Sequence, residues 1–454
     1  MPVEWTETAV YATGLLGAML AAVVSAGELA VPQGAGEGWA RRHAGFNARA
    51  REGNADLVFL GDSWVEGWET AGKEAWARFY GDRQAVNFGI AGDGAERILW
   101  RVEHGNFEGL APKLVVLMCD NDDETSTPEQ LAEGVKPLVG KLRARLPKAK
   151  VLLLGLLPSG ANPEDPKRQS LAQANQRLAQ FADDKQVFFL DLGPRLLDLE
   201  GRRPPEFWAD EKRLTPRGYE ICAEWLDQRV TTLMGALENP LLPAPLDPPG
   251  WNGAWLKRHE SFNERARQGG VDLIFIGDSI TNGWINEGKR VWETYYGKRN
   301  AVNLGISTDR IQNVLWRLDH GNVDGISPKL AVVMIGTNNS SRSKPELIPA
   351  GIKAVVERLR AKLPQTKILL LAIFPRGADS QDRWRLVNDK VNAEIAQFAD
   401  DERVYFLDIG PKLLAPDGTA SKDILRDLLH LSEKGYEIWA ASIEPLVAKL
   451  MGER

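Results

Sequence analysis

The sequence predicts an α/β protein built from two tandem three-layer α/β/α domains, each with a mostly parallel five-stranded sheet. Two observations lead to this prediction: the 454-residue chain contains one internal duplication, and each copy alternates short apolar runs with longer amphipathic stretches. Near-continuous apolar runs are typical of parallel strands that are buried on both faces. Strands of this kind that alternate with helices predict a sheet covered by helices on both sides.

The duplication is visible as sequence blocks that recur at a nearly constant distance. AVNFGIAGD, which ends at Asp93, recurs as AVNLGISTD, which ends at Asp309, an offset of 216. Beyond Pro112 and Pro328 the offset becomes 217, so one residue is missing or added between positions 112 and 128. A period as long as a whole domain indicates tandem domains and not a solenoid.

The duplication divides the chain into four segments. Five prolines between 239 and 250 exclude a helix or a central strand there and favour a stiff, extended linker. Residues 9–26 are apolar and end in small residues, as a signal peptide does, although no basic residue precedes them. We expect a secreted or periplasmic protein if this stretch is a signal, and a cytoplasmic one otherwise. The predicted segments are a leader or signal peptide (1–37), a first domain (38–236), a Pro-rich linker (237–250) and a second domain (251–454).

Each expected strand of the second domain is an apolar run, and the segments between the runs are helix-like. One of these segments, residues 345–363, has a proline in its first turn and basic residues towards its end, as helices do. Ligand sites of parallel sheets lie at the carboxyl ends of the strands, where the motifs GDS, GISTD and GTNN fall. The expected strands cover 273–276, 301–304, 330–335, 367–374 and 404–409.

Composition excludes several other classes of function. The net charge of -6 leaves no basic excess for neutralising phosphates, so nucleic-acid binding is not expected. No segment after the leader is apolar enough to span a membrane. Cys119 and Cys222 form neither a CxxC pair nor a zinc-binding pattern, and no metal site is expected.

A candidate nucleophile, Ser279, directly follows the first strand of the second domain. A serine nucleophile needs a base, and the base needs a carboxylate that orients it. The chain has five histidines, and four form pairs related by the duplication, which predicts structural roles for His43, His259, His104 and His320. The unpaired one is His430, which follows Asp427 by three residues. His430 is therefore the candidate base.

These blocks, in this order, resemble the SGNH (GDSL-type) hydrolase superfamily. Within it, VNLGI, VLWRLDHGN, PKLAVVMIGTNN and DLLHLSEKGY are similar to the catalytic subunits of platelet-activating-factor acetylhydrolase and to related bacterial esterases. The resemblance implies a flavodoxin-like fold and ester hydrolysis without metal or cofactor. It also implies Ser279 as nucleophile, His430 as general base and then acid, and Asp427 as the residue that orients His430.

The same resemblance implies an oxyanion hole made of the backbone N–H groups of Ser279 and Thr308 and the side chain of Asn338. Thr308 stands where the family has glycine. A β-branched residue disfavours the positive φ that glycine permits, and its side chain could narrow the acyl pocket.

The first domain matches the family less well. Ser63, Gly92 and Asp210 fit the pattern, but Arg213 stands in place of the base and cannot accept a proton from a hydroxyl. The oxyanion asparagine corresponds to Asn121 if the one-residue gap lies in the strand, and to Asp122 if it lies in the loop. A loop tolerates a gap more easily, and a carboxylate would repel the oxyanion. We therefore expect an inactive first domain.

The function expected from these observations is hydrolysis of small esters with short acyl groups, acetyl above all, with an acetylated carbohydrate as one substrate class. Trp64 is a candidate ligand contact, whereas Trp68 and Trp284 are related by the duplication and are expected in the core. One alternative is a non-catalytic carbohydrate-binding or scaffold protein with two degenerate hydrolase domains. Another is a thioesterase or lysophospholipase. The two domains are expected to pack as an intrachain pseudo-dimer.

Overall fold

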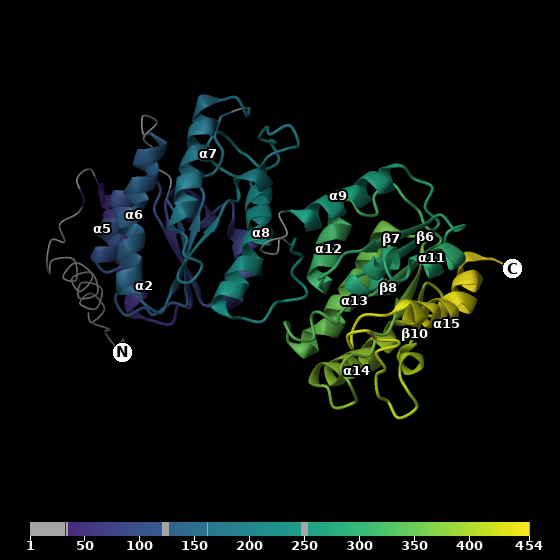
Figure 1. Cartoon of the computed structure of the whole chain (residues 1–454). Helices are drawn as coiled ribbons and strands as arrows, with labels where there is room; N and C mark the ends of the chain where they lie inside the picture. Colours follow the sequence, from purple (N-terminus) through teal and green to yellow (C-terminus); the bar gives the residue numbers. More distant parts are fainter. Residues whose placement is uncertain (1–31, 33–34, 120–126, 161, 247–252, 454) are drawn as a thin grey trace, which may run out of the picture.

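The structure is a computed structural model, and it describes residues 32, 35–119, 127–160, 162–246 and 253–453. The chain forms two α/β domains that lie side by side (Figure 1). Most of the expected leader lies outside the described residues, as do the last residues of the expected linker.

Each domain contains a sheet of five parallel strands, as the sequence predicts. The strand order of the first sheet is β2-β1-β3-β4-β5, and that of the second is β10-β9-β8-β6-β7, which is the same order read from the opposite edge. This is the flavodoxin-like order, in which the chain reverses direction beside the first strand and leaves a crevice there for ligands. The strands are β1 (Leu57–Gly61), β2 (Ala85–Gly89), β3 (Leu114–Met118), β4 (Lys150–Leu154), β5 (Val187–Leu190), β6 (Leu273–Gly277), β7 (Ala301–Gly305), β8 (Leu330–Met334), β9 (Lys367–Leu371) and β10 (Val404–Leu407).

Helices cover both faces of each sheet and close one apolar core on each face. The helix expected over 345–363 is a 3₁₀ turn at Pro345–Leu347 followed by α13. No described helix is both long and apolar enough to cross a bilayer. The helices of the first domain are α2 (Glu37–Arg51), α3 (Ser63–Glu66), α4 (Lys73–Tyr80), α5 (Ala95–Glu103), α6 (Pro128–Arg145), α7 (Pro166–Leu178) and α8 (Pro216–Met234). Those of the second domain are α9 (Ala254–Arg267), α10 (Ser279–Asn282), α11 (Lys289–Tyr295), α12 (Ile311–Asp319), α13 (Ile348–Lys362), α14 (Arg383–Ile395) and α15 (Glu433–Met451).

The two domains contact each other through helices that are not equivalent in the duplication. On the side where the domains meet, α8 of the first domain packs on α12 of the second (Figure 1). Trp316 donates its indole N–H to Glu224 at 2.7 Å, and its ring meets that of Trp225 edge to face. The duplication relates α8 to α15 and α12 to α5. A two-fold pseudo-dimer would also pair α5 with α15, but these helices lie on opposite outer sides of the molecule (Figure 1), so the contact is heterologous.

The buried carboxyl group of Glu224 makes the stability of the chain depend on pH. Burial raises the pKa of Glu224 from 4.5 to about 7, although Arg217 and Trp316 counteract the rise. The folded state thus binds more protons than the unfolded state between these values. The free energy of unfolding should fall as the pH rises through this window, by at most about 3 kcal/mol from this group. Thermal unfolding at pH 5 and pH 8 should show a larger loss in the wild type than in Glu224→Gln, which cannot titrate. Equal losses in the two proteins would contradict the assignment.

Candidate active site

Ser279 begins helix α10 immediately after strand β6. The glycine two residues earlier, Gly277, is required by packing, because a Cβ there would overlap the carbonyl oxygen of Met334 and the hydroxyl of Thr281. Its φ is not positive, so the tight turn does not depend on glycine's conformational freedom. The absence of a side chain brings α10 close against the ends of β6 and β8, at the carboxyl edge of the sheet.

The last helix of the domain braces this short helix. The phenol of Tyr436, in α15, donates a hydrogen bond to the carbonyl of Ile280 at 2.6 Å. The same arrangement occurs in the first domain, where Tyr219 donates to Trp64 O at 2.9 Å. The paired Gly-Tyr motif near the end of each copy therefore fixes the position of the serine.

The structure brings Ser279, His430 and Asp427 together. The distance between Ser279 Oγ and His430 Nε2 is 2.9 Å, and that between His430 Nδ1 and Asp427 Oδ2 is 2.7 Å. Ser279 and His430 are separated by 151 positions in the sequence. A hydroxyl in contact with one imidazole nitrogen, and a carboxylate in contact with the other, is the arrangement required for base-assisted nucleophilic attack.

The loop that carries His430 is held by local hydrogen bonds. Asp427 Oδ1 accepts the backbone N–H groups of Leu429 at 3.1 Å and of His430 at 2.7 Å. Leu428 adopts a left-handed φ of 65°, and its carbonyl accepts the N–H of Gly377 at 2.9 Å. Strain of this kind persists only where the surrounding structure fixes it. These contacts orient the imidazole before any ligand binds.

Two carboxyl groups of the site are in opposite electrostatic environments. Burial raises the pKa of Asp278 to about 7, and the nearby Asp309 adds to the rise. Burial also opposes ionisation of Asp427, but hydrogen bonds from the backbone and the ring of His430 outweigh it and hold the pKa of Asp427 below its usual value. Asp427 is therefore the carboxylate that stays charged beside the imidazole.

Thr308 adopts a left-handed backbone conformation, which glycine permits and a β-branched residue disfavours. Its φ is 68°, close to the 79° of Gly92 at the corresponding position of the first domain. A β-branched residue in this region costs on the order of 1–3 kcal/mol. A Cβ built on Gly92 would lie in open space, and the exposed Thr308 side chain extends into the corresponding space.

Asn338 lies in the loop that follows β8 and contacts the loop that contains Thr308. Its side-chain amide donates one hydrogen bond to the carbonyl of Asp309 at 2.9 Å. An amide nitrogen carries two hydrogens, so this bond orients the group and leaves the second hydrogen available for a ligand.

A buried brace below the Thr308 loop was not anticipated from the sequence. Asp309 accepts the indole N–H of Trp255 at 2.6 Å and forms an ion pair with Arg317 at 2.8 Å. The first domain repeats it with Asp93, Trp39 and Arg101. Two of the paired histidines, His43 and His259, hydrogen-bond to buried asparagines nearby, and burial lowers the pKa of their rings to about 4 and about 3. Their geometry is that of structural histidines.

The corresponding loop of the first domain keeps the backbone hydrogen bonds to its aspartate without an imidazole, although it lacks the left-handed residue found at Leu428. Asp210 accepts the backbone N–H groups of Lys212 at 2.9 Å and of Arg213 at 2.8 Å, which together with the Arg213 guanidinium lower the pKa of Asp210 to about 2. The side chain of Arg213 is 80% exposed and contacts Asp210 at 2.5 Å. Asp210 thus has a structural role that does not require a base. Ser63, at the start of α3, is exposed.

The one-residue difference between the copies does not lie in the third strand. Leu114–Met118 and Leu330–Met334 keep the offset of 216 along their whole length. The gap therefore follows the strand, so the condition under which Asn121 would correspond to the oxyanion asparagine is not met. Both residues lie outside the described residues.

The expectation that Trp64 contacts a ligand is wrong. Its side chain is 5% exposed and packs between the rings of Trp68 and Tyr219 in the core. Trp68 and Trp284 are buried, as expected. Ile280, which aligns with Trp64, is buried as well, so this position faces the core in both domains.

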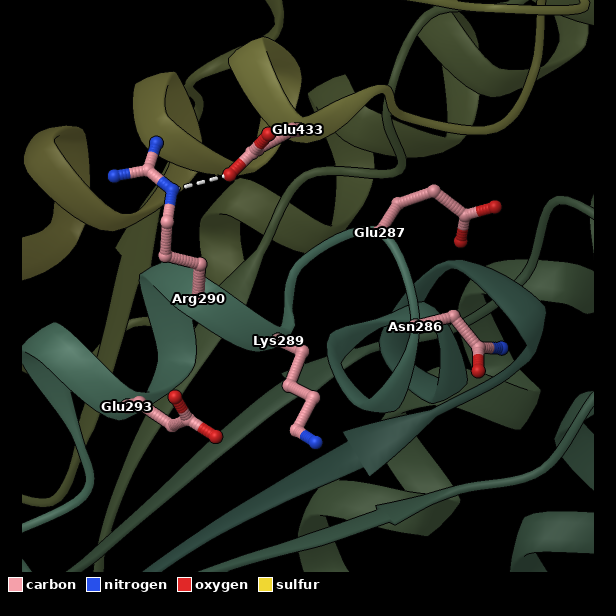
Figure 2. Close-up of a pocket in the computed structure, with 6 residues that line it drawn as sticks. All are labelled: Asn286, Glu287, Lys289, Arg290, Glu293 and Glu433. Atoms are coloured by element: carbon pink, nitrogen blue, oxygen red, sulfur yellow. Dashed lines mark hydrogen bonds and ion pairs between the residues drawn. The ribbon is translucent and has the colours of Figure 1, made fainter.

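A surface hollow of about 450 Å³ lies beside α11 and the start of α15 (Figure 2). Its lining is entirely polar or charged, and Arg290 pairs with Glu433 across it. Glu287 at its rim pairs with Arg426, which belongs to the loop that carries His430. Acyl groups bind to apolar surfaces, so this hollow does not fit an acyl pocket. It is lined by Asn286, Glu287, Lys289, Arg290, Glu293 and Glu433.

The fold agrees with the comparison with known families. A model of the GDSL-like lipase/acylhydrolase family matches residues 59–221 and 275–438, which together make up more than half of the chain. The chain belongs to this family and carries two tandem domains of it. Membership places the protein among hydrolases.

Among curated proteins, the chain is similar to the alpha1 subunit of platelet-activating factor acetylhydrolase IB from Rattus norvegicus. The two are 33% identical over 225 residues, which cover 49% of this chain and 94% of the relative. The alpha2 subunit from the same organism is 32% identical over 203 residues, 44% of this chain and 86% of the relative. Among solved structures, an acetylxylan esterase from Geobacillus stearothermophilus is 21% identical, with a TM-score of 0.33 over 41% of this chain and 96% of that one.

Proposed function

We propose that the second domain is a serine carboxylic ester hydrolase with Ser279, His430 and Asp427 as its catalytic triad. The observation that supports the proposal is the continuous contact from the Ser279 hydroxyl through both nitrogens of His430 to Asp427, at 2.9 and 2.7 Å. A protein that only binds its ligand has no need of this alignment.

In the proposed reaction, Ser279 Oγ attacks the ester carbonyl carbon while His430 Nε2 accepts the hydroxyl proton. The carbonyl oxygen becomes an oxyanion, held by the backbone N–H groups of Ser279 and Thr308 and by the Asn338 amide. The C–O bond to the alcohol breaks, and His430 returns the proton to the leaving alcohol. Water then attacks the acyl-serine with His430 again as base, which releases the acid and restores the serine.

The proposed substrates are esters of short acyl groups, with acetyl as the first candidate. The curated relatives are acetylhydrolase subunits, which supports this choice. The exposed Thr308 side chain, at a position where Gly92 leaves open space, also favours a small acyl group. Burial of Trp64 removes the observation that favoured a sugar ring, so the alcohol part of the ester is left unassigned.

We propose that the first domain does not catalyse this reaction. Arg213 occupies the position of the base, remains protonated, and is paired with Asp210. The position that His430 occupies in the second domain therefore holds no base for Ser63.

Labelling with a fluorophosphonate, followed by peptide mapping, tests these assignments together. This reagent reacts with activated serines, so label is expected on Ser279 and not on Ser63. Label on neither serine would favour the binding or scaffold function instead, and label on Ser63 would contradict the inactive first domain. Rates with acetyl, long-chain and thioester substrates then separate an acetylesterase from a lysophospholipase or thioesterase.

A further inference from the structure

Glu238 reaches from the segment between the domains into the second domain. It follows the end of α8 by four residues, and its backbone N–H donates to the carbonyl of Arg342 at 2.7 Å. Its carboxylate is buried, forms an ion pair with Arg310, and accepts the side-chain amide of Gln312 at 2.7 Å. Glu238 thus contacts the start of α12 and the loop after β8 at the same time.

These two segments carry the proposed oxyanion donors. Arg310 follows Thr308 by two residues, and Arg342 belongs to the loop after β8, which also contains Asn338. Asn339 completes the connection, because its side chain accepts the N–H of Ile311 at 3.0 Å and donates to Gln312 at 3.0 Å. Arg310, Gln312 and Asn339 are all buried.

We infer that Glu238 is a positioning residue, which fixes the Thr308 loop and the Asn338 loop relative to each other and so holds the oxyanion hole of the second domain in place. This inference rests on the proposed function for its catalytic consequence. It gives the linker, and the first domain that anchors it, a role in the chemistry of the second.

The first domain lacks the partners of Glu238. The duplication places Gly94 at the position of Arg310 and Glu96 at that of Gln312. It also has Gly92 in place of the strained Thr308. A left-handed threonine persists only where neighbouring contacts fix it, and the Glu238 network supplies such contacts two residues away. The strained residue and the partners of Glu238 thus occur together in the second domain, and the first domain has other residues at each of these positions.

The test uses Glu238→Gln in the full chain, with Glu224→Gln as the matched control. Both glutamates are buried and bind α12, but Glu224 contacts Trp316, away from the oxyanion loops. A displaced oxyanion hole lowers kcat and leaves ground-state binding intact. For p-nitrophenyl acetate we expect Glu238→Gln to lower kcat by about tenfold or more, with KM within about twofold, and Glu224→Gln to leave both nearly unchanged. Equal losses in the two variants would overturn the inference.

Two further variants make the result specific. Gln312→Ala removes the hydrogen bond to the Glu238 carboxylate and the one from the Asn339 amide but keeps the ion pair with Arg310, so a folded protein is expected, with kcat lower by about threefold. In a Thr308→Gly background, where glycine needs no support at positive φ, the loss caused by Glu238→Gln should shrink to less than about threefold. The same loss in both backgrounds would overturn the link between Glu238 and Thr308.

Amide hydrogen exchange tests the inference without relying on activity. Peptides that contain Thr308 and Asn338 should exchange faster in Glu238→Gln than in the wild type, and should be unchanged in Glu224→Gln. If the wild type hydrolyses no ester, the proposed function fails while this measurement still decides on Glu238. Unchanged exchange in Glu238→Gln would overturn the inference even in an active enzyme.

Discussion

Replacing Ser279 with alanine is expected to abolish ester hydrolysis, by about 10³-fold or more in kcat. The variant loses the attacking oxygen, which is the hydroxyl that contacts His430 Nε2 at 2.9 Å. Removal of a triad member leaves only the rate acceleration that comes from substrate binding and from the oxyanion donors. Initial rates with p-nitrophenyl acetate, at equal concentrations of wild type and variant, measure the effect.

Ser63→Ala is the matched control for this prediction. It removes the equivalent hydroxyl from the domain in which arginine stands in place of the base, so the rate should remain within about twofold of wild type. A rate lowered by both changes would show that both domains turn over. A rate lowered by Ser63→Ala alone would reverse the assignment of the two domains.

The strands could be predicted from the sequence because their apolar runs reflect burial on both faces. Three runs of the second domain extend past the ends of their strands, for one physical reason, and the other two stop one residue before the strand ends, Gly277 and Gly305. The run over 367–374 contains a strand that ends at Leu371, and Ile373 and Phe374 beyond that end are still buried in the two apolar cores of the domain. Apolar character indicates burial, and at this edge of the sheet the chain stays buried for several residues beyond the end of the strand.

The partners of the candidate triad were also accessible from the sequence, since one histidine broke the pairing between the copies. The contacts of Glu238 were not, because Glu238 and Arg310 are 72 positions apart and belong to no periodic pattern. The surfaces through which the two domains contact each other could not be predicted from the sequence either. Glu224 and Trp316 occupy ordinary positions in amphipathic helices, and only their contact in three dimensions distinguishes them.

Replacing His430 with arginine, the residue of the first domain, should inactivate the second domain while leaving it folded. In the first domain Arg213 pairs with Asp210, which accepts the backbone N–H group of Arg213 as Asp427 accepts that of His430. The guanidinium introduced by His430→Arg is therefore expected to pair with Asp427 in the same way, with an unfolding midpoint close to that of the wild type. A guanidinium cannot accept the serine proton, so kcat should fall by about 10³-fold or more. Retention of wild-type activity in this variant would remove His430 from the proposed mechanism.

The reverse change, Arg213→His, separates the loss of the base from other defects of the first domain. Tested in the Ser279→Ala background, in which the second domain is inactive, it introduces an imidazole next to Asp210 at the position that corresponds to His430. The block that would supply an oxyanion asparagine is acidic in this copy, from Asp120 to Glu124. Negative charge there opposes a developing oxyanion. Fluorophosphonate labelling of Ser63 should therefore stay at background, whereas efficient labelling would mean that the base alone distinguishes the two domains.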